Sequence, residues 1–560
     1  MPKFSCDRYY RYDELSQTLQ DFASEFPHLL KLGSIGKSYE GREIWLLEAT
    51  NFATGNPEEK PALWVDGNIH SSEVAASALC LYFLNTLVKG YGYDDDITRC
   101  LDTRAFYICP RINPDGAELA LAESPKFVRS GTRIYPPALP EKNDLIEEDI
   151  DGDGRHLTMR MPDRNGAWKV CPEEPRLMIP RDPTETGGEY YRLLPEGTIA
   201  NYDGSLINTP PPKEGLDFNR NFPYQWRSEC EQFGAGDYPT SEPEVRAVTD
   251  FIVSHANLTG AIAFHTMSAV LLRPYSNQSD ENFPISDLRV YEHIGKKGEE
   301  ITGYPVASIY HEFRRDRKDN TSGALDDWCY EERGIFAWTV ELWSPIRQAD
   351  IENYHYTQWF KEHPLEDDLA ILRWNDEVLD GKGYVDWYPF EHPQLGKIEL
   401  GGWDAFSFWR NPPLSLLEKE LSPFPQWLVW HLLISPLLAI REAKVERMGT
   451  QLYLVQLVVE NTGWLPTYVA KKALEKKLTR GCIATIELPE GASLSMGEPE
   501  EMLGELEGRA YHSSAVIWRG SDATKDRAKV EWLVRASEGI VKLEVRCDRA
   551  GVARTEVELK

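Results

Sequence analysis

A short polar segment, His70-Ser71-Ser72-Glu73, stands at the junction of a predicted strand and a predicted helix. The strand is the run at residues 62–66, and the helix is the longer apolar run at residues 74–87. A histidine and a glutamate three residues apart can close on one metal ion, because zinc accepts imidazole nitrogen and carboxylate oxygen as ligands. Such pairs also occur by chance, and the alternative is a capping histidine with a first-turn glutamate favoured by the helix dipole. The rest of the chain must therefore supply the remaining parts of a site.

Two later strand-like runs also deliver a polar residue at their carboxyl ends. The run at 260–264 is followed by His265, and the run at 336–340 is followed by Glu341. Strands that alternate with helices predict an α/β domain with a mixed central sheet flanked by helices, and sites in such sheets lie at the carboxyl ends of strands. Two histidines and a glutamate form a three-ligand zinc set with one position open for water. Glu341 is the second carboxylate that such a site needs to take the proton of that water and pass it to a leaving amine.

The length of 560 residues exceeds one hydrophobic core, so several domains are expected. The α/β pattern covers residues 1–362 and contains a long polar insertion, rich in proline and glycine, at about 124–214. Residues 363–440 are predicted to form a connector that includes a helix. Period-2 alternation dominates residues 441–560 and predicts a β-sandwich. We expect this sandwich to be an accessory domain that stabilises the protein or restricts its substrates.

Composition limits the partners and the compartment. The 61 basic and 90 acidic residues give a net charge of −29, which argues against nucleic acid and anionic membranes, since both bind basic patches. An odd number of cysteines, nine, without a Cys-x-x-Cys pair is typical of a reducing compartment. The first residues contain no apolar signal-peptide core, and the most apolar run, at 427–440, is too short to span a bilayer. We therefore expect a cytoplasmic protein, and the sequence does not indicate its oligomeric state.

An acidic loop within the insertion indicates a second candidate cation site. Asp149, Asp151 and Asp153 occupy alternate positions and are followed by Gly154, which resembles the first half of a calcium-binding loop. The twelfth position is Arg160 rather than the glutamate that such loops use, and no helix pair flanks the loop. Two interpretations therefore stay open, a Ca²⁺ site at the three aspartates and a solvated acidic turn.

The ordered set of polar residues resembles the zinc carboxypeptidase family, in particular the pancreatic carboxypeptidase A/B type and its bacterial relatives. The resemblance covers roughly residues 7–360. The motifs that carry it are His70-x-x-Glu73, Asn113-Pro114-Asp115-Gly116, Asn219-Arg220-Asn221, His265, Ser322-Gly323, Asp327-Trp328 and Glu341. The resemblance implies a carboxypeptidase-like fold and a zinc cofactor. It matches His70, Glu73 and His265 to the zinc ligands of the family, and it matches Glu341 to the general base.

The resemblance also implies residues that bind the substrate. Asn219 and Arg220 match the pair that grips the C-terminal carboxylate of the substrate, a task that suits a guanidinium because its fork pairs bidentately with a carboxylate. The oxyanion-stabilising arginine of the family falls about a dozen residues after the Asn-Pro-Asp-Gly turn. In this chain Arg129 is the preferred candidate for that role, and Arg133 is the reserve.

Three features depart from the pancreatic pattern. The residue before the zinc-ligand glutamate is Ser72, where the pancreatic enzymes have arginine. The position of their mobile substrate-binding tyrosine falls on Asp319, and Tyr310 or Tyr330 could replace that tyrosine only by a different route. The insertion at 124–214 is the third departure. These departures concern substrate specificity and leave zinc hydrolysis untouched.

Asp326 lies at the position that forms the floor of the side-chain pocket in this family. An acidic residue there resembles the B-type enzymes, and a buried carboxylate selects a C-terminal Lys or Arg by pairing with it. The alternative is that Asp326 pairs with nearby basic residues, which are Arg314, Arg315, Arg317 and Lys318.

Three functions remain to be separated. The leading hypothesis is a zinc metallocarboxypeptidase in which zinc-activated water, assisted by Glu341, attacks the last peptide bond while Arg220 holds the terminal carboxylate. The first alternative is a zinc amidohydrolase that acts on non-standard amides, such as cell-wall-derived peptides or N-acyl amino acids. The second alternative is a catalytically inactive peptide-binding protein.

Overall fold

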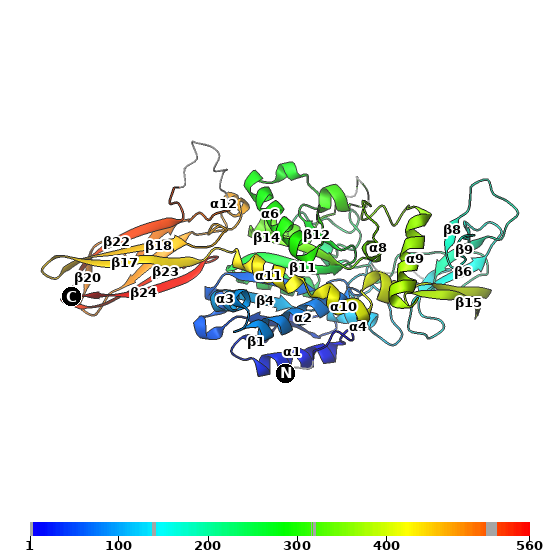
Figure 1. Ribbon diagram of the computed structural model, residues 1–560, viewed down its shortest axis with the longest axis horizontal. Helices are drawn as coiled ribbons and strands as arrows, with labels where there is room; N and C mark the ends of the chain where they lie inside the picture. The colour runs from blue at the N-terminus through cyan, green and yellow to red at the C-terminus, as the bar shows by residue number, and fades with distance from the viewer. Residues whose placement is uncertain (1–3, 137–141, 315, 317, 319–320, 511–522) are drawn as a thin grey trace.

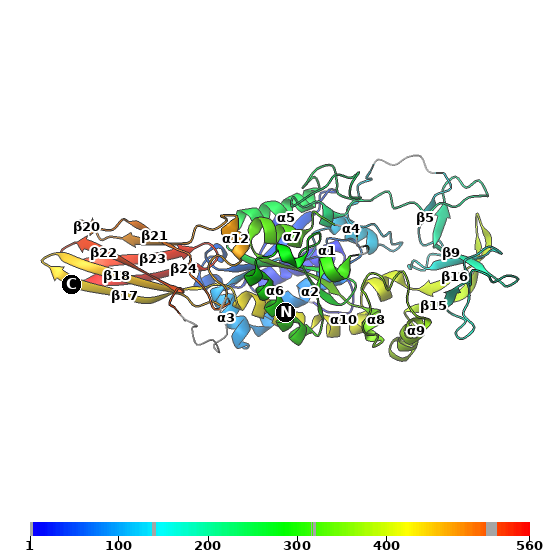
Figure 2. The same ribbon diagram turned by 90° about the horizontal axis from the view of Figure 1, so that it is seen from above.

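The computed structural model describes the chain except for residues 1–3, 137–141, 315, 317, 319–320 and 511–522. The molecule is elongated, with an α/β body in the middle and a β-rich region at each end (Figure 1). The C-terminal strands form one end. Strands of the insertion and of the connector lie together at the other end (Figure 2).

A mixed sheet runs through the α/β body. Within the described residues it has eight strands in the order β1-β2-β4-β3-β11-β14-β12-β13. Their bounds are β1 Leu30–Lys37, β2 Glu43–Ala49, β3 Ala62–Gly67, β4 Ala105–Cys109, β11 Leu258–Thr266, β12 Val270–Arg273, β13 Val306–Ser308 and β14 Phe336–Leu342. The central strands β4, β3, β11 and β14 are parallel and almost entirely buried. Burial on both faces explains why each of them is a continuous apolar run in the sequence.

Two apolar clusters occupy the two faces of this sheet. The main helices on one face are α1 (Tyr12–Glu25), α2 (Val74–Gly90), α3 (Asp95–Thr103), α6 (Ile285–Thr302) and α11 (Phe424–Leu433). The helices on the other face are α5 (Pro243–Ser254) and α7 (Leu325–Trp328). The predicted α/β fold, a mixed central sheet flanked by helices, is confirmed.

The insertion and the connector contribute strands to one common sheet. Six described strands pair in the order β15-β16-β6-β9-β7-β8. The insertion supplies β6 (Thr158–Pro162), β7 (Trp168–Val170), β8 (Met178–Pro180) and β9 (Tyr191–Pro195), and the connector supplies β15 (Tyr384–His392) and β16 (Gly396–Trp403). A separate pair, β5 (Leu145–Glu147) and β10 (Gly197–Ile199), packs on this sheet. The insertion is therefore not an isolated loop, because β16 pairs with β6 through Leu400 and Met159.

The connector is more structured than the sequence indicated. It begins with α9 (Leu365–Leu379) and continues through the β15–β16 hairpin. The single helix expected before residue 440 is in fact two, α10 (Leu414–Leu421) and α11. Pro423 separates them, because proline has no N–H to donate to the preceding turn.

The C-terminal region forms a β-sandwich, as predicted, and its first strand begins at Leu438. In its described part, two four-stranded antiparallel sheets have the orders β17-β18-β22-β20 and β21-β19-β23-β24. The strands are β17 Leu438–Gly449, β18 Leu452–Asn461, β19 Cys482–Glu487, β20 Ser493–Met496, β21 Glu500–Gly504, β22 Arg527–Arg535, β23 Gly539–Cys547 and β24 Gly551–Leu559. Buried residues alternate with partly exposed ones along β18, and the inner faces of both sheets share one core around Trp532.

The sandwich attaches to the body at the amino end of β14. Arg549 Nη1 donates to the carbonyl of Gly334 at 2.9 Å, just before that strand begins. On the same side, the backbone N–H of Lys471 donates to Asp287 Oδ1 at 2.8 Å. Glu341 lies near the opposite, carboxyl end of β14. The sandwich therefore contacts the sheet at the edge away from the strand ends where the sequence predicts a site.

Two further observations concern the helices and the cysteines of the described residues. No single helix in the described part of the chain is long and apolar enough to cross a membrane; α2 and α3 reach that length and composition only together, across a bend of 100°. All nine cysteines lie in the described residues, and each of them is free.

Candidate metal centre

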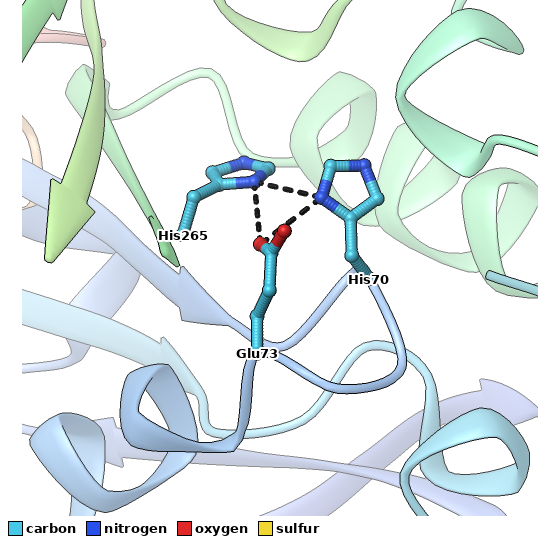
Figure 3. A group of neighbouring side chains, drawn as sticks. All are labelled: His70, Glu73 and His265. Atoms are coloured by element: carbon cyan, nitrogen blue, oxygen red, sulfur yellow. Dashed lines mark hydrogen bonds and ion pairs between the residues drawn. The ribbon is translucent and has the colours of Figure 1, made fainter. Parts of the chain in front are cut away.

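Three side chains converge at the carboxyl ends of β3 and β11 (Figure 3). His70 lies in the loop after β3, Glu73 directly precedes α2, and His265 lies in β11. The histidine Nδ1 atoms are 3.0 and 3.1 Å from Glu73 Oε2 and 3.1 Å from each other. All three side chains are buried. The donor set fits zinc, since ligands about 2 Å from a tetrahedral ion lie about 3.3 Å apart.

Two asparagine side chains fix the loop between β3 and α2. Asn68 has φ of 57°, and its Nδ2 donates to the carbonyls of His70 and Ser71 at 2.6 and 3.1 Å. Asn113 Nδ2 donates to the carbonyl of Ser130 at 2.8 Å. The Asn-Pro-Asp-Gly motif therefore has a structural task, which is to hold the chain around Ser130 near the metal-site loop.

Asp217, which the sequence analysis did not single out, orients His70. Its Oδ1 is 3.2 Å from His70 Nε2, the ring nitrogen that is not directed at the cluster. Burial opposes ionisation of Asp217, but the charges of Arg129 and Arg220 outweigh this effect and hold its pKa well below the ordinary value. A carboxylate behind a metal-ligating histidine fixes the ring and its tautomer. The signal that could have revealed it is its position two residues before Asn219.

Of the two candidate arginines, Arg129 lies beside the cluster. Its Nε donates to Asp217 at 3.0 Å and its Nη1 donates to Glu73 at 3.3 Å. The side chain is 40% exposed, so it stays accessible to a substrate. Arg133, the reserve candidate, pairs instead with Glu242 at 2.6 Å.

Glu341 lies on the strand next to His265, at the same level of the sheet. The two residues are register partners in the parallel pair of β11 and β14. Burial and the negative charge of Glu73 raise the pKa of Glu341 to about 7, while His265, Arg129 and Arg410 oppose that rise. Its Oε2 has no hydrogen-bond partner among the described residues. A carboxyl group in this position is suited to exchange a proton near neutral pH.

The short turn Phe218–Arg220 places two predicted substrate-binding residues beside Asp217. Asn219 is buried, and its Oδ1 accepts a hydrogen bond from the Leu325 backbone at 2.9 Å. Arg220 is half-buried and donates to the Asn219 carbonyl at 2.7 Å. Gly323 packs against this turn, because a Cβ there would lie 2.4 Å from the Arg220 carbonyl. The Ser-Gly motif therefore supports the backbone that carries the two residues.

Asp326 is buried in α7 and faces the same strand as Glu341. Thr339 Oγ1 donates to Asp326 Oδ2 at 3.1 Å. Thr339 precedes Glu341 by two residues, so both side chains lie on one face of β14. Burial raises the pKa of Asp326, which means that its charge is poorly solvated.

Three residues named above are outside the described part of the chain: Arg315, Arg317 and Asp319.

The candidates for a substrate-binding tyrosine lie in different surroundings. Tyr330 is fully buried and its hydroxyl donates to Asp287 at 2.9 Å, so it is a core residue. Tyr310 is half-buried, and the Arg314 guanidinium lies 3.7 Å from the centre of its ring.

One arginine of the connector also reaches the cluster. Arg410 is the last residue of the π-helical segment Ala405–Arg410, and its Nη1 is 3.8 Å from Glu73 Oε1. Arg410 was not predicted from the sequence, because it lies well beyond the last metal-site motif.

The acidic loop has a different character from the buried cluster. The ligand atoms of Asp149, Asp151 and Asp153 lie within 4.8 Å of one another, but these residues are half-buried or exposed. The Asp149 carboxylate accepts backbone hydrogen bonds from Gly152 at 2.7 Å and Gly154 at 2.8 Å. The loop thus satisfies its own carboxylates, as an acidic turn does, and calcium is not supported.

Comparison with known families agrees with this geometry. A family model described as zinc carboxypeptidase matches residues 15–171 and 177–359. A second model, described as a domain of unknown function (DUF8731), matches residues 437–558, which form the β-sandwich.

Individual proteins are similar over the same part of the chain. Carboxypeptidase A1 of Mus musculus is 25% identical over 340 residues, which are 60% of this chain and 63% of that protein. Carboxypeptidase A5 of Macaca fascicularis is 26% identical over 341 residues, which are 60% of this chain and 61% of that protein. The chain thus spans less than two thirds of the length of these relatives.

Among solved structures, the chain is similar to carboxypeptidase A from Helicoverpa armigera, with 19% identity, a TM-score of 0.39 and coverage of 67% of this chain and 76% of that one. Thrombin activatable fibrinolysis inhibitor is similar at 21% identity and a TM-score of 0.39, over 61% of this chain and 71% of that one. The family match extends over more than half of the residues, and the chain belongs to the zinc carboxypeptidase family.

Proposed function

We propose that the protein is a zinc-dependent metallocarboxypeptidase that removes residues from the C-terminus of peptides. The observation that carries this proposal is the convergence of His70, Glu73 and His265 on one point, with Glu341 at the same level on the next strand. Membership in the zinc carboxypeptidase family supports the same reaction.

Each residue at the centre has a task in this reaction. His70, Glu73 and His265 hold the zinc ion, which when bound polarises the scissile carbonyl and lowers the pKa of water. Glu341 accepts a proton from the attacking water and delivers it to the nitrogen of the leaving residue, two steps that its pKa of about 7 suits. Arg129 lies beside Glu73, where its guanidinium stabilises the negative charge that develops on the carbonyl oxygen.

Arg220 and Asn219 bind the terminal carboxylate of the substrate in this proposal. Arg220 ends the short turn that follows Asp217, and Asp217 contacts His70 at 3.2 Å, so this turn lies beside the metal centre. A guanidinium fork binds a carboxylate bidentately, and only the last residue of a peptide carries that carboxylate. This contact restricts hydrolysis to the last peptide bond.

A preference for basic C-terminal residues is the finer part of the proposal. The buried carboxylate of Asp326 has a raised pKa because its charge lacks solvation. A Lys or Arg side chain of the substrate would pair with that charge. We expect kcat/KM to be about tenfold higher for a C-terminal Arg than for a C-terminal Leu, and Asp326→Asn to remove the difference. Equal values in the unmodified enzyme would contradict this preference.

A peptide and its C-terminal amide distinguish the candidate functions. Amidation removes the carboxylate, and we expect it to lower kcat/KM by about 100-fold in the zinc-loaded enzyme, the loss of a bidentate charged contact. In Arg220→Gln, both substrates should react at the lower rate. Equal rates in the unmodified enzyme would favour an amidohydrolase of non-standard amides, for which the presence of Ser72 is the motivating observation. No hydrolysis across a broad peptide panel would favour a peptide-binding protein.

We further propose a cytoplasmic location. The nine free cysteines support it. Cell fractionation tests this proposal, and recovery of the protein in a secreted fraction would contradict it.

A further inference from the structure

The connector segment 404–411 lies against the loop that carries Glu73. Asn411 is completely buried, and its Nδ2 donates to the Ser72 carbonyl at 2.8 Å. Its Oδ1 accepts a hydrogen bond from the Ala75 backbone at 3.0 Å. Asn411 therefore fixes the end of the connector segment to both sides of Glu73.

The same segment is also fixed to two other parts of the site. Trp343, two residues after Glu341, donates from Nε1 to the Phe408 carbonyl at 2.6 Å. The ring of Phe406 stacks on Phe127, two residues before Arg129, with 5.3 Å between the ring centres. The segment thus touches three of the chain segments that build the metal centre.

The first turn of the segment is capped. Asp404 Oδ1 accepts backbone hydrogen bonds from Phe406 at 3.0 Å and Ser407 at 2.8 Å. The residues that follow form a π-helix, a local form that is frequent at functional sites. Capping at one end and Asn411 at the other hold Arg410 in a defined place.

Arg410 extends a row of guanidinium groups across the metal centre. Its side chain is 36% exposed, and its Nη1 is 3.8 Å from Glu73. Arg129 Nε donates to Asp217 at 3.0 Å, and its Nη1 lies 3.3 Å from the same Glu73 oxygen that Arg410 approaches. Arg129 therefore reaches from Asp217, which directly precedes the turn that ends in Arg220, to Glu73, where Arg410 approaches from the segment that is bonded to Trp343.

We propose that Arg410 is a further substrate-binding residue, which donates hydrogen bonds to the carbonyl oxygen one residue before the scissile carbonyl. The inference rests on the proposed carboxypeptidase reaction. With the terminal carboxylate at Arg220 and the scissile carbonyl at Arg129, the next carbonyl of an extended peptide lies about 3.5 Å further along. Arg410 is the guanidinium that the connector supplies on that side, and a guanidinium keeps its charge and its donors at every physiological pH.

This assignment places a specificity determinant in the connector. Arg410 lies outside the residues that match the zinc carboxypeptidase family, which end at 359. The connector therefore supports the insertion strands and also supplies a side chain to the site. Substrates that carry an acylated residue before the scissile bond gain a contact that the shortest substrates lack.

Two substrates, one with and one without the acylamino group that carries this carbonyl, test this inference. One is an N-acyl dipeptide, and the other is an analogue in which an alkyl chain replaces the acylamino group. Arg410→Gln is expected to lower kcat/KM for the N-acyl dipeptide about 10- to 100-fold, mainly through KM, and to leave the analogue within about twofold. Arg410→Lys should recover part of the loss. Arg373→Gln, a change at an exposed residue of α9 in the same connector, is the matched control and should change neither substrate.

Equal losses on both substrates would overturn the inference, because they would show an effect on Glu73 or Glu341 instead of a contact with the carbonyl. No loss on either substrate would overturn it as well. Failure of the proposed reaction is a separate result, in which the unmodified zinc-loaded protein hydrolyses neither substrate. Calorimetric binding of the two compounds then decides the question. Weaker binding of the N-acyl dipeptide alone in Arg410→Gln supports the inference, and equal binding to both proteins overturns it.

Discussion

The chain contains two clusters that could hold a cation, and they differ in what surrounds the ligand atoms. His70, Glu73 and His265 are buried, and their donor atoms point at one another. The three aspartates of the 149–153 loop are more exposed, and backbone amides of the loop already satisfy Asp149. A metal ion at the loop would have to displace contacts that the carboxylates already make, whereas at the buried cluster it would relieve the crowding of a carboxylate and two imidazoles.

The comparison shows why spacing alone does not identify a metal site. Both clusters were found from the pattern of ligand types in the sequence. The buried one has a supporting carboxylate, Asp217, behind a histidine and a second carboxylate, Glu341, beside it. Such supporting groups orient metal ligands, and their presence separates a binding site from an acidic turn.

Removal of one buried ligand should have the largest effect. His265→Ala is expected to lose zinc, from about one ion per chain to nearly none, together with hydrolysis. Asp151→Asn in the acidic loop should retain both properties. Metal analysis after gel filtration, with a peptide assay, measures them. Equal zinc content in the two variants would contradict the claim that the buried cluster, and not the acidic loop, binds zinc.

Replacement of the proposed general base should abolish turnover without loss of metal. Glu341→Gln keeps the size of the side chain but cannot accept the proton, so kcat should fall by about 10²- to 10⁴-fold while zinc content stays the same. Glu196→Gln is the matched control, because burial raises the pKa of Glu196 to about 7 as well. If Glu341→Gln hydrolyses peptides at the unmodified rate, the assigned mechanism is wrong.

The group behind the ligand should have an intermediate effect. Asp217→Asn removes the charge that orients His70, and we expect zinc affinity to fall about 10- to 100-fold. Competition with a chelator of known affinity gives the value. Asp163→Asn, on the insertion, serves as control. Unchanged affinity in Asp217→Asn would show that His70 needs no orienting partner.

Glu196, a buried carboxyl group that contacts the acidic loop through the Ile150 backbone, should show the smallest effect, on stability alone. Burial raises the pKa of Glu196 to about 7. Hydrogen bonds from the backbone amides of Leu157 and Ile150 oppose this rise, and the negative charges of Asp151 and Asp149 add to it. The folded state therefore prefers the neutral carboxyl. The stabilising contribution of the neutral Glu196 carboxyl is complete at pH values below the unfolded-state pKa of 4.5. It is lost as the pH rises through the folded-state pKa of about 7. Glu196→Gln should reduce the change in the free energy of unfolding across this pH range by about 1 kcal/mol.

Melting temperatures at pH 5 and pH 8 measure that effect, and the same difference in both proteins would contradict it. The pH profile of peptide hydrolysis should not change in Glu196→Gln. The two carboxyl groups, at 196 and 341, have pKa values raised for the same first reason, burial, yet only one of them stands at the metal centre.

The sequence predicted the parts of the site that follow from strand ends. His265 and Glu341 each come near the end of a buried parallel strand, so a one-dimensional pattern was enough to bring them together. Asp217 was missed because its partner, His70, is 147 residues away and no strand delivers it. Arg410 was missed because the connector reaches the site only through tertiary packing of Phe406 and Asn411.

The fold was predictable to a similar extent. Alternating helices and strands indicated the α/β body, and period-2 alternation indicated the sandwich. The common sheet of insertion and connector could not be predicted, because β16 pairs with β6 and the paired residues Leu400 and Met159 are far apart in the sequence. Local pattern indicates that a strand exists but not which distant strand it pairs with.

A crystal of the zinc-loaded protein, measured above and below the zinc absorption edge, tests the central assignment most directly. We expect one anomalous peak between His70, Glu73 and His265, with Glu341 beside it, and no peak at the aspartates of the acidic loop. A peak at the loop alone, or no zinc at the buried cluster, would contradict the assignment of the metal centre and the reaction proposed from it.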